Sequence, residues 1–316
     1  MATTTKLVLN TPVQERSSLW RRIVFHKYFY IMLVPILTWY VIFCYIPMYG
    51  LTLAFKTYHF GKGIGGSPWA GLQNFTDILN DSQYIVSLKN TVIISLGKLV
   101  FHFPIPIILA LLLNQIVGQR IKKLYQTVLT FPHFISWVVL GGIITNILGS
   151  QGVYNQITGL FGWDPSSPLT NPEIFRPLVY VTHIWKEVGW DSIIYLAALA
   201  GINPELYEAA DMDGAGSFKK MIHVSWPGIK STVAILFILN VGLMMNVSFD
   251  QIYNLYSAPV YEVADTVDTY ILRTTMSVGS NFGLLAAAGF IKSVLSMMLL
   301  LMANYVVKRF GEQGLF

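Results

Sequence analysis

Four long stretches of the chain contain no Asp, Glu, Lys or Arg. They cover 28–55, 99–119, 124–163 and 231–249. About 20 apolar residues are enough to cross the hydrocarbon core of a bilayer. Over its 316 residues the chain is 54% apolar and only 12% charged, which is more apolar surface than one soluble core can absorb. The sequence therefore predicts an all-α, multi-pass membrane protein.

Six membrane-spanning helices are predicted from the apolar runs. The first run is far longer than the core of a signal peptide and no small-residue cleavage site follows it, so we expect it to be retained. Residues 1–27 are expected to form a cytoplasmic segment and 28–316 the membrane domain. The predicted spans are 28–55, 84–113, 124–149, 177–201, 231–250 and 283–307.

Basic residues gather on one side of these spans. Because Lys and Arg next to a span resist translocation, the side that holds most of them is predicted to be cytoplasmic. Four lie on the other side, namely Lys56, Lys62, Arg176 and Arg273. Thirteen lie on the cytoplasmic side: Lys6, Arg16, Arg21, Arg22, Lys27, Arg120, Lys122, Lys123, Lys219, Lys220, Lys230, Lys308 and Arg309. Both termini and the loop 201–230 are therefore expected in the cytoplasm, and the net charge of +5 requires no nucleic-acid partner.

Several classes of chemistry lack their sequence signatures. Cys44 is the single cysteine, so neither a disulfide framework nor a thiolate metal cluster can form, and single histidines such as His102 have no second ligand at a useful spacing. The two Gly-Lys pairs, at 61–62 and 97–98, are not followed by Ser or Thr, so no phosphate-binding loop is present. We expect no catalysis by this chain. The acidic outward stretch 250–273 is expected to be a solvated loop.

The cytoplasmic loop 201–230 contains its own helix signals. Asn203 is a good N-cap, Pro204 suits the first helical position, and Glu205 complements the positive end of a helix dipole. A short helix is predicted to begin there and to run to about Met212.

A tight turn is predicted to follow this helix. Gly214 and Gly216 permit a left-handed conformation, Ser217 can cap a second helix, and Pro227 is expected to interrupt that helix before the fifth span. Two short helices joined by a tight turn at the membrane face form a compact protrusion suited to docking.

The same loop contains a spaced motif: Glu208-Ala209-Ala210, three residues, Gly214, nine residues, Val224, one residue, Trp226 and Pro227. This pattern resembles the EAA loop of bacterial ABC importer permeases. Val224 and Trp226 replace the family's Ile and Leu, and both replacements stay apolar. An N-terminal set resembles the start of permeases for oligosaccharides and polysaccharide fragments: Pro47-Met48-Tyr49-Gly50, Ala54-Phe55-Lys56, Gly66-Ser67-Pro68-Trp69, Gly71-Leu72 and Asn74-Phe75.

The resemblance implies a type I ABC importer permease fold in the bacterial cytoplasmic (inner) membrane. It also implies a second permease, a dimer of ATP-binding subunits that holds ATP and Mg²⁺, and an external or periplasmic solute-binding protein that delivers an oligosaccharide. No cofactor is expected on this chain. The residues to which the family's ATPase-coupling role transfers are Glu208, Ala209, Ala210, Asp213 and Gly214.

The fourth predicted span carries a stripe of polar residues. They are spaced so that they share one helical face, and ionisable groups in a membrane are too costly to face lipid. The stripe comprises His183, Lys186, Glu187, Trp190 and Asp191. One interpretation is a sugar pathway, with Trp190 stacking on a pyranose ring. The other is mutual neutralisation, for example of Asp191 or Glu187 by Lys98 or Lys292. His133, Trp137 and Trp185 are expected to be packing or interface residues.

The fifth span offers a second polar patch, Asn240 and Met244, with Asn246 and Ser248 as further candidates. Such side chains either join helices or line the pathway. Lys98, Lys186 and Lys292 would suit a uronate-containing substrate, unless they are paired internally.

Two rival classes stay open on the sequence alone. A secondary transporter or channel could use the fourth-span charges as an ion relay, but the EAA spacing would then be a coincidence. An intramembrane enzyme could use His183, Glu187 and Asp191 as acid and base groups, but it would lack a nucleophile or metal set.

Overall fold

The computed structural model describes residues 24–164, 166–246, 249–277, 279, 281–312 and 314–315. Within these ranges every regular element is helical and no strand occurs, apart from an isolated bridge between Lys56 and Trp69. The all-α prediction is confirmed. Because residues 1–23 lie outside the described part, the cytoplasmic segment 1–27 stays a prediction. The chain divides into two units, Met1–Thr52 and Leu53–Phe316.

The first unit contains the start of the first apolar run, Lys27–Phe55. This run consists of α2 (Lys27–Tyr40), a π turn (Val41–Tyr45), α3 (Ile46–Met48) and a 3₁₀ segment (Tyr49–Phe55) that ends in the second unit. The π turn widens the helix directly before Pro47, whose ring would crowd a regular turn. No residue of α2 is buried, so its apolar side chains are available to lipid or to another subunit.

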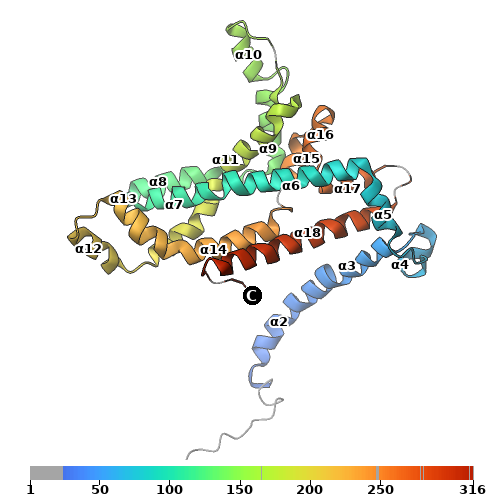
Figure 1. The fold of residues 1–316 in the computed structure, drawn as a ribbon, viewed down its shortest axis with the longest axis horizontal. Coiled ribbons are helices and arrows are strands. Elements are labelled where there is room, and N and C mark those ends of the chain that lie inside the picture. The colour runs from blue at the N-terminus through green and yellow to red at the C-terminus, as the bar shows by residue number, and fades with distance from the viewer. Residues whose placement is uncertain are drawn as a thin grey trace, which may run out of the picture. The chain divides into compact units, whose positions relative to one another are not determined.

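The second unit is a bundle in which α11 is central (Figure 1). Helix α11 lies against α6, α7, α8 and α14, and α18 lies alongside α14. Its helices are α4 (Gly63–Gly66), α5 (Gln73–Asn80), α6 (Ser82–His102), α7 (Pro104–Asn114), α8 (Gln119–Thr130), α9 (Trp137–Leu148), α10 (Val153–Leu160), α11 (Pro172–Ala200), α12 (Pro204–Met212), α13 (Ser217–Lys220), α14 (Trp226–Leu243), α15 (Phe249–Leu255), α16 (Tyr261–Ala264), α17 (Val267–Thr275) and α18 (Phe282–Arg309). Short 3₁₀ or π segments lie at Phe60–Lys62, Phe131–Phe134, Pro168–Thr170, Met221–Ser225 and Ala258–Val260.

In the described part of the chain, four helical runs are long and apolar enough to cross a membrane. They are Lys27–Phe55, Ser82–Asn114, Ser217–Leu243 and Phe282–Arg309. The first, second and fourth of these lie close to the predicted spans 28–55, 84–113 and 283–307. Helix α11 has 29 residues, which is long enough to cross, but its ionisable stripe makes it less apolar than these four.

The third predicted span, 124–149, is not one straight helix. The chain bends by 93° between Gln119–Phe134 and Trp137–Leu160, and this pair would count as a fifth crossing if it were one broken span. Pro132 has no N–H to donate, the backbone is extended at Ile135, and Ser136 caps α9 by accepting a hydrogen bond from the Val139 N–H. The helix is therefore broken by the proline and by the capping of α9, and not by a loss of apolar residues.

The fifth predicted span, 231–250, is shifted along the chain. The helical run begins at Ser217 and ends at Leu243, and α15 starts at Phe249. Pro227 does not interrupt the run as predicted, because the π turn Met221–Ser225 precedes it and widens the helix there. The segment after Leu243 turns, and the Met244 carbonyl accepts a hydrogen bond from Ser95 Oγ at 3.0 Å.

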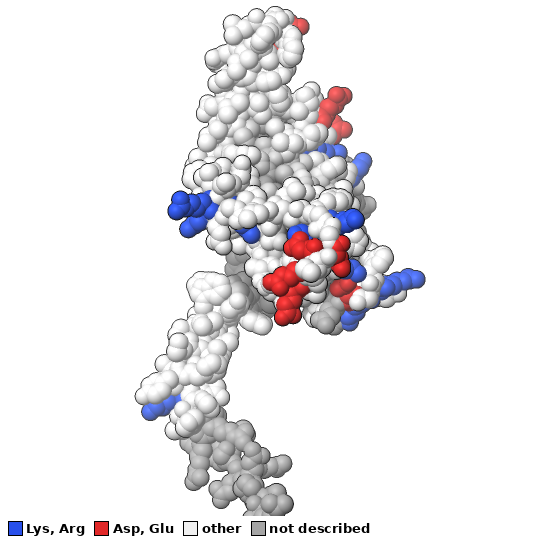
Figure 2. Space-filling view, turned by 90° about the vertical axis from the view of Figure 1, so that its left-hand side faces the viewer, with Lys and Arg blue, Asp and Glu red and all other residues white. Residues whose placement is uncertain are grey.

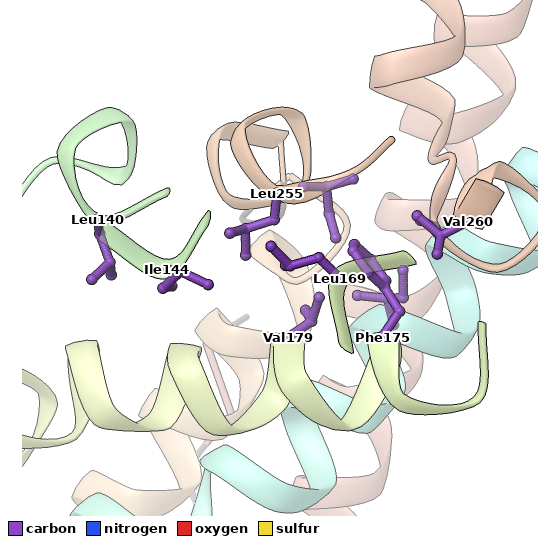
Figure 3. Packing of buried hydrophobic residues seen from close by; sticks show 10 residues of the cluster. Leu140, Ile144, Leu169, Phe175, Val179, Leu255 and Val260 are labelled. Carbon is purple, nitrogen blue, oxygen red and sulfur yellow. The ribbon is translucent and has the colours of Figure 1, made fainter. Parts of the chain in front are cut away.

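Helices α9, α11 and α15 meet over an apolar core (Figure 3). Leu140 and Ile144 come from α9, Phe175 and Val179 from α11, and Leu255 from α15. This contact fixes the bent half of the third span and the short helix after the fifth span to the same side of α11.

The acidic stretch 250–273 is not a solvated loop. It folds into α15, α16 and most of α17, and Asp265 is buried with its carboxylate 2.6 Å from Arg273. Tyr270 donates a hydrogen bond of 2.7 Å to Asp81, and burial together with this bond raises the pKa of the phenol. Asp265 and Asp268 thus have partners elsewhere in the fold, Ser87 and Arg273 for the first and Lys292 for the second, which composition alone could not reveal.

Candidate functional site

Helix α12 forms as the sequence predicts. The Asn203 side chain accepts a hydrogen bond from the Glu205 N–H at 3.1 Å, and Pro204 occupies the first turn. Gly214 has a φ of 71°, in the left-handed region that glycine adopts without strain. Gly216, with a φ of −67°, is the N-cap of α13, and Ser217 is the first residue of that helix rather than its cap.

Side chains connect α12 to the helical run Ser217–Leu243 that follows it. The hydroxyls of Tyr207 and Ser225 are 2.9 Å apart, and Lys220 Nζ lies 2.7 Å from Asp211. Ser225 is fully buried and is the N-cap residue of α14. A movement of α12 can therefore be transmitted to the membrane-crossing run Ser217–Leu243 through the Tyr207–Ser225 hydrogen bond as well as through the backbone.

The outer surface of α12 is free in this structure. None of its residues is buried, and Leu206 and Met212 expose 53% and 90% of their surface. Figure 2, which faces the side where α12 lies in Figure 1, shows acidic side chains gathered there. A hollow of about 390 Å³ lies between α12 and the segment that follows it. It is lined by Leu206, Ala209, Ala210, Asp213, Ala215, Lys219, His223 and Val224.

The structure explains why alanines suit the motif. Ala209 and Ala210 form part of the wall of the hollow, so larger side chains there would fill it. Asp213 also lines it, and Gly214 makes the turn that closes α12. Glu208 is exposed on α12. Four of the five predicted coupling residues are thus placed around one concave, exposed surface or its turn, with Glu208 beside it.

The stripe on α11 separates into two groups. The first faces α6. The rings of His183 and His102 meet edge to face with centroids 4.7 Å apart, and His102 Nε2 lies 3.3 Å from the Asp191 carboxylate, without hydrogen-bond geometry. Lys98 completes this group on α6; it is buried and its Nζ has no partner among the described residues.

The second group faces α8 and the 3₁₀ turn that follows it. The Glu187 carboxylate accepts from Lys186 Nζ at 2.9 Å and lies 2.6 Å from His133 Nδ1. The Trp190 ring stacks on His133 with centroids 4.2 Å apart. One face of Trp190 is therefore already covered, so a pyranose ring could stack only on its other face.

Asn240 and Met244 of the fifth span join the first group. Both line a cavity of about 40 Å³ together with residues of α6 and α11, and a second cavity of about 40 Å³ is lined by Asn240, His102 and Asp191 among others. Asn246 is exposed, and Ser248 lies outside the described residues. The structure thus brings His183, Asp191, Asn240 and Met244 together.

Neither Glu187 nor Asp191 forms an ion pair with Lys98 or Lys292 in the described residues, although Glu187 attracts Lys98 electrostatically. Glu187 pairs with Lys186 on its own helix, and Asp191 approaches His102. Lys292 binds Asp268, with 2.6 Å between Nζ and a carboxylate oxygen. Neutralisation therefore does occur, but with partners that only the packing of the helices determines. Within the described ranges no cluster of three or more His, Cys, Asp or Glu side chains could hold a metal ion.

Comparison with known proteins decides the family. A family model of the inner membrane component of binding-protein-dependent transport systems matches residues 102–312. The chain belongs to this family. The match spans the whole of α11 and α12, so the surfaces of these two helices are those of a transport permease.

Two curated relatives come from Bacillus subtilis (strain 168). The polygalacturonan/rhamnogalacturonan transport system permease protein YteP is 38% identical over 304 residues, which cover 96% of this chain and 94% of that protein. Protein LplB is 38% identical over 291 residues, covering 92% and 91%. The predicted resemblance to carbohydrate ABC importer permeases is confirmed.

Two solved structures share the fold. One is a bacterial ABC transporter involved in the import of the acidic polysaccharide alginate, with a TM-score of 0.84, 38% identity, and coverage of 93% of this chain and 99% of that chain. The other is the bacterial alginate ABC transporter in complex with an alginate pentasaccharide-bound periplasmic protein, with a TM-score of 0.84, 37% identity, and coverage of 95% and 100%. The fold of ABC importer permeases is thereby established for this chain.

Proposed function

We propose that this chain and a second permease form the pathway by which an oligosaccharide or polysaccharide fragment enters a bacterial cell. The observation behind this proposal is the exposed helix α12, which presents the motif residues Glu208, Ala209 and Ala210 beside a hollow and is bonded to the head of α14. The saccharide follows from the relatives, whose names specify pectic and alginate polymers.

The proposed assembly has four kinds of component. An ATP-binding dimer, which holds ATP and Mg²⁺, docks on α12, and an external solute-binding protein delivers the substrate from the other side. This chain hydrolyses no ATP and needs no cofactor of its own. The inner membrane location, the six crossings and the cytoplasmic termini belong to the same proposal, with α11 and the broken helix pair as the two crossings beyond the four apolar runs.

The polar groups on α11 form part of the proposed pathway. His183, Asp191, Asn240 and Met244 surround the small cavities between α6, α11 and α14, while Glu187 and Trp190 lie on the neighbouring face of α11. Rocking of the attached helices by the docked ATPase would expose this lining alternately to the two sides.

A charge reversal on α12 tests the proposal. We expect Glu208→Lys to abolish oligosaccharide uptake and to weaken copurification of the ATP-binding subunit, while the amount of permease in the membrane stays normal. The control is Asp164→Lys, which makes the same charge change at an exposed position remote from α12 in the sequence. It should leave uptake and copurification of the ATP-binding subunit unchanged. Normal uptake by the Glu208→Lys permease would contradict the proposal.

The energy source separates the proposal from a secondary transporter. Uptake should stop when the partner ATPase carries an inactivating substitution and should continue when an uncoupler removes the proton gradient but ATP is maintained. The reverse pattern would show an ion-driven carrier.

A further inference from the structure

Lys98 is an unusual residue of the second span. Its side chain is buried, with 6% of the residue exposed, and its ammonium has no hydrogen-bond partner among the described residues. A charged group in a membrane interior is costly and is normally paired or in contact with water. The arrangement around Lys98 therefore calls for an anionic partner.

The other lysines of the predicted spans do not share this property. Lys186 donates to Glu187 and to the carbonyl of His133, and Lys292 donates to both carboxylate oxygens of Asp268. Lys89, on the same helix as Lys98, is exposed. Of these four lysines, Lys98 alone is both buried and unpaired in the described structure.

The nearby carboxylates do not form an ion pair with Lys98. Glu187 attracts it electrostatically but is held by Lys186 and His133. Asp191 lies against His102. No described carboxylate is within the 4.0 Å of an ion pair, so any strong partner must come from outside the described chain.

The space beside Lys98 is small, and five of its eight lining residues carry polar side chains. It measures about 40 Å³, room for one or two water molecules or for a carboxylate group, but not for a sugar ring. It is lined by Ser95, Lys98, Leu99, His102, Phe103, His183, Asn240 and Met244. The Met244 carbonyl would repel an anion, but it accepts a hydrogen bond from Ser95 Oγ. His183 Nδ1 is buried and has no hydrogen-bond partner among the described residues.

We propose that Lys98 binds the carboxylate of a uronate residue as the oligosaccharide passes, with His183 and Asn240 supplying further hydrogen bonds in the same cavity. This inference rests on the proposed function and specifies the residue that recognises an acidic substrate. A bound carboxylate would give the Lys98 ammonium, which has no hydrogen-bond partner among the described residues, a charged partner. A neutral hydroxyl would compensate the charge less well, because hydrogen bonds between two charged groups are stronger.

The test is uptake of trigalacturonate into vesicles that contain the complete transporter with its solute-binding protein. Lys98→Met replaces lysine by an unbranched side chain that is one atom shorter and has no charge, and Lys98→Arg keeps the charge. Lys89→Met removes a lysine from an exposed position of the same helix and is the matched control. Basal ATP hydrolysis and the midpoint of thermal unfolding are measured on each variant.

We expect Lys98→Met to lower the maximal uptake rate about tenfold, the scale of losing a hydrogen bond between charged groups. Basal ATP hydrolysis should be unchanged, Lys98→Arg should recover part of the rate, and Lys89→Met should match the unchanged protein. The unfolding midpoint of Lys98→Met should be equal or higher, because an unpaired buried charge is removed.

Two results would overturn this inference without touching the proposed function. The first is an uptake rate for Lys98→Met within twofold of the unchanged protein. The second is a lowered unfolding midpoint together with lost ATP hydrolysis, which would show that Lys98 pairs with a carboxylate of the second permease. If the unchanged transporter imported no oligosaccharide at all, the proposed function itself would fail.

Discussion

The hydroxyls of Tyr207 and Ser225 lie 2.9 Å apart and join the exposed helix α12 to the buried head of α14. They are eighteen residues apart in the chain, and a glycine turn and a second short helix separate them. Together with the ion pair between Asp211 and Lys220, this bond links the proposed docking surface to the membrane-crossing run Ser217–Leu243.

Removing that link should weaken the coupling of ATP hydrolysis to uptake. A neutral hydrogen bond contributes about 0.5–1.5 kcal/mol, so Tyr207→Phe should lower the uptake per ATP hydrolysed roughly two- to tenfold. Ser225→Ala should do the same, and the double variant should be no worse than either single one. Tyr305→Phe, at an exposed site on α18, is the control. Additive losses in the double variant would show that the two hydroxyls act separately.

Gly214 and Gly216 allow a matched comparison within the turn. The φ of Gly214 is 71°, where a Cβ costs about 1–2 kcal/mol, whereas the φ of Gly216 is −67° and nothing lies within 4 Å of its Cβ position. Gly214→Ala should therefore reduce uptake and ATPase copurification, and Gly216→Ala should leave both close to normal. Equal effects of the two substitutions would argue against the left-handed turn.

Gly189 marks the crossing of α11 and α8. A Cβ at this position would overlap the backbone of Leu129, whereas a Cβ at Gly142 in α9 would meet nothing within 4 Å. We expect Gly189→Ala to reduce the free energy of unfolding by about 1–3 kcal/mol or more. Gly142→Ala should leave it equal or slightly higher, because alanine is the better helix former. Thermal unfolding in detergent, followed by circular dichroism, measures the difference. If Gly189→Ala left the free energy of unfolding unchanged, helices α8 and α11 would have to be further apart than described.

The Lys292–Asp268 pair should be structural. Lys292→Met alone leaves Asp268 without its partner and should cost about 3–5 kcal/mol of stability, because breaking a buried ion pair leaves an uncompensated charge. The double variant Lys292→Met with Asp268→Leu should recover most of that loss. Chemical denaturation of the purified permease compares the unsubstituted protein, the single variant and the double variant. If Asp268→Leu did not restore stability to Lys292→Met, the pairing would be contradicted.

Much of the fold follows from local sequence. Apolar runs located the first, second and sixth spans, and the signals at Asn203, Pro204 and Gly214 placed α12 and its turn at the observed residues. Such features are predictable because they depend on a few neighbouring residues. The bend after Pro132 was missed because the run stays apolar on both sides of it.

The polar site was predictable only in part. Helical spacing placed His183 and Asp191 on one stripe, but it could not show that His133 covers Trp190 or that Asp268 neutralises Lys292. These contacts join residues that are far apart in the chain. A signal for Lys98 was nevertheless present, because the residue lies near the middle of the predicted span 84–113, where an ammonium needs a partner.

The central claim is that α12 is the surface on which an ATP-binding subunit docks. The most direct measurement places a photo-crosslinking benzoylphenylalanine at Met212, which is exposed on α12 and does not line the hollow, in cells that produce the whole transporter. The same group at the exposed Trp163 is the control. We predict a light-dependent adduct between position 212 and the ATP-binding subunit, and none from position 163. If position 212 gave no such adduct, or if position 163 gave it instead, the account would be contradicted.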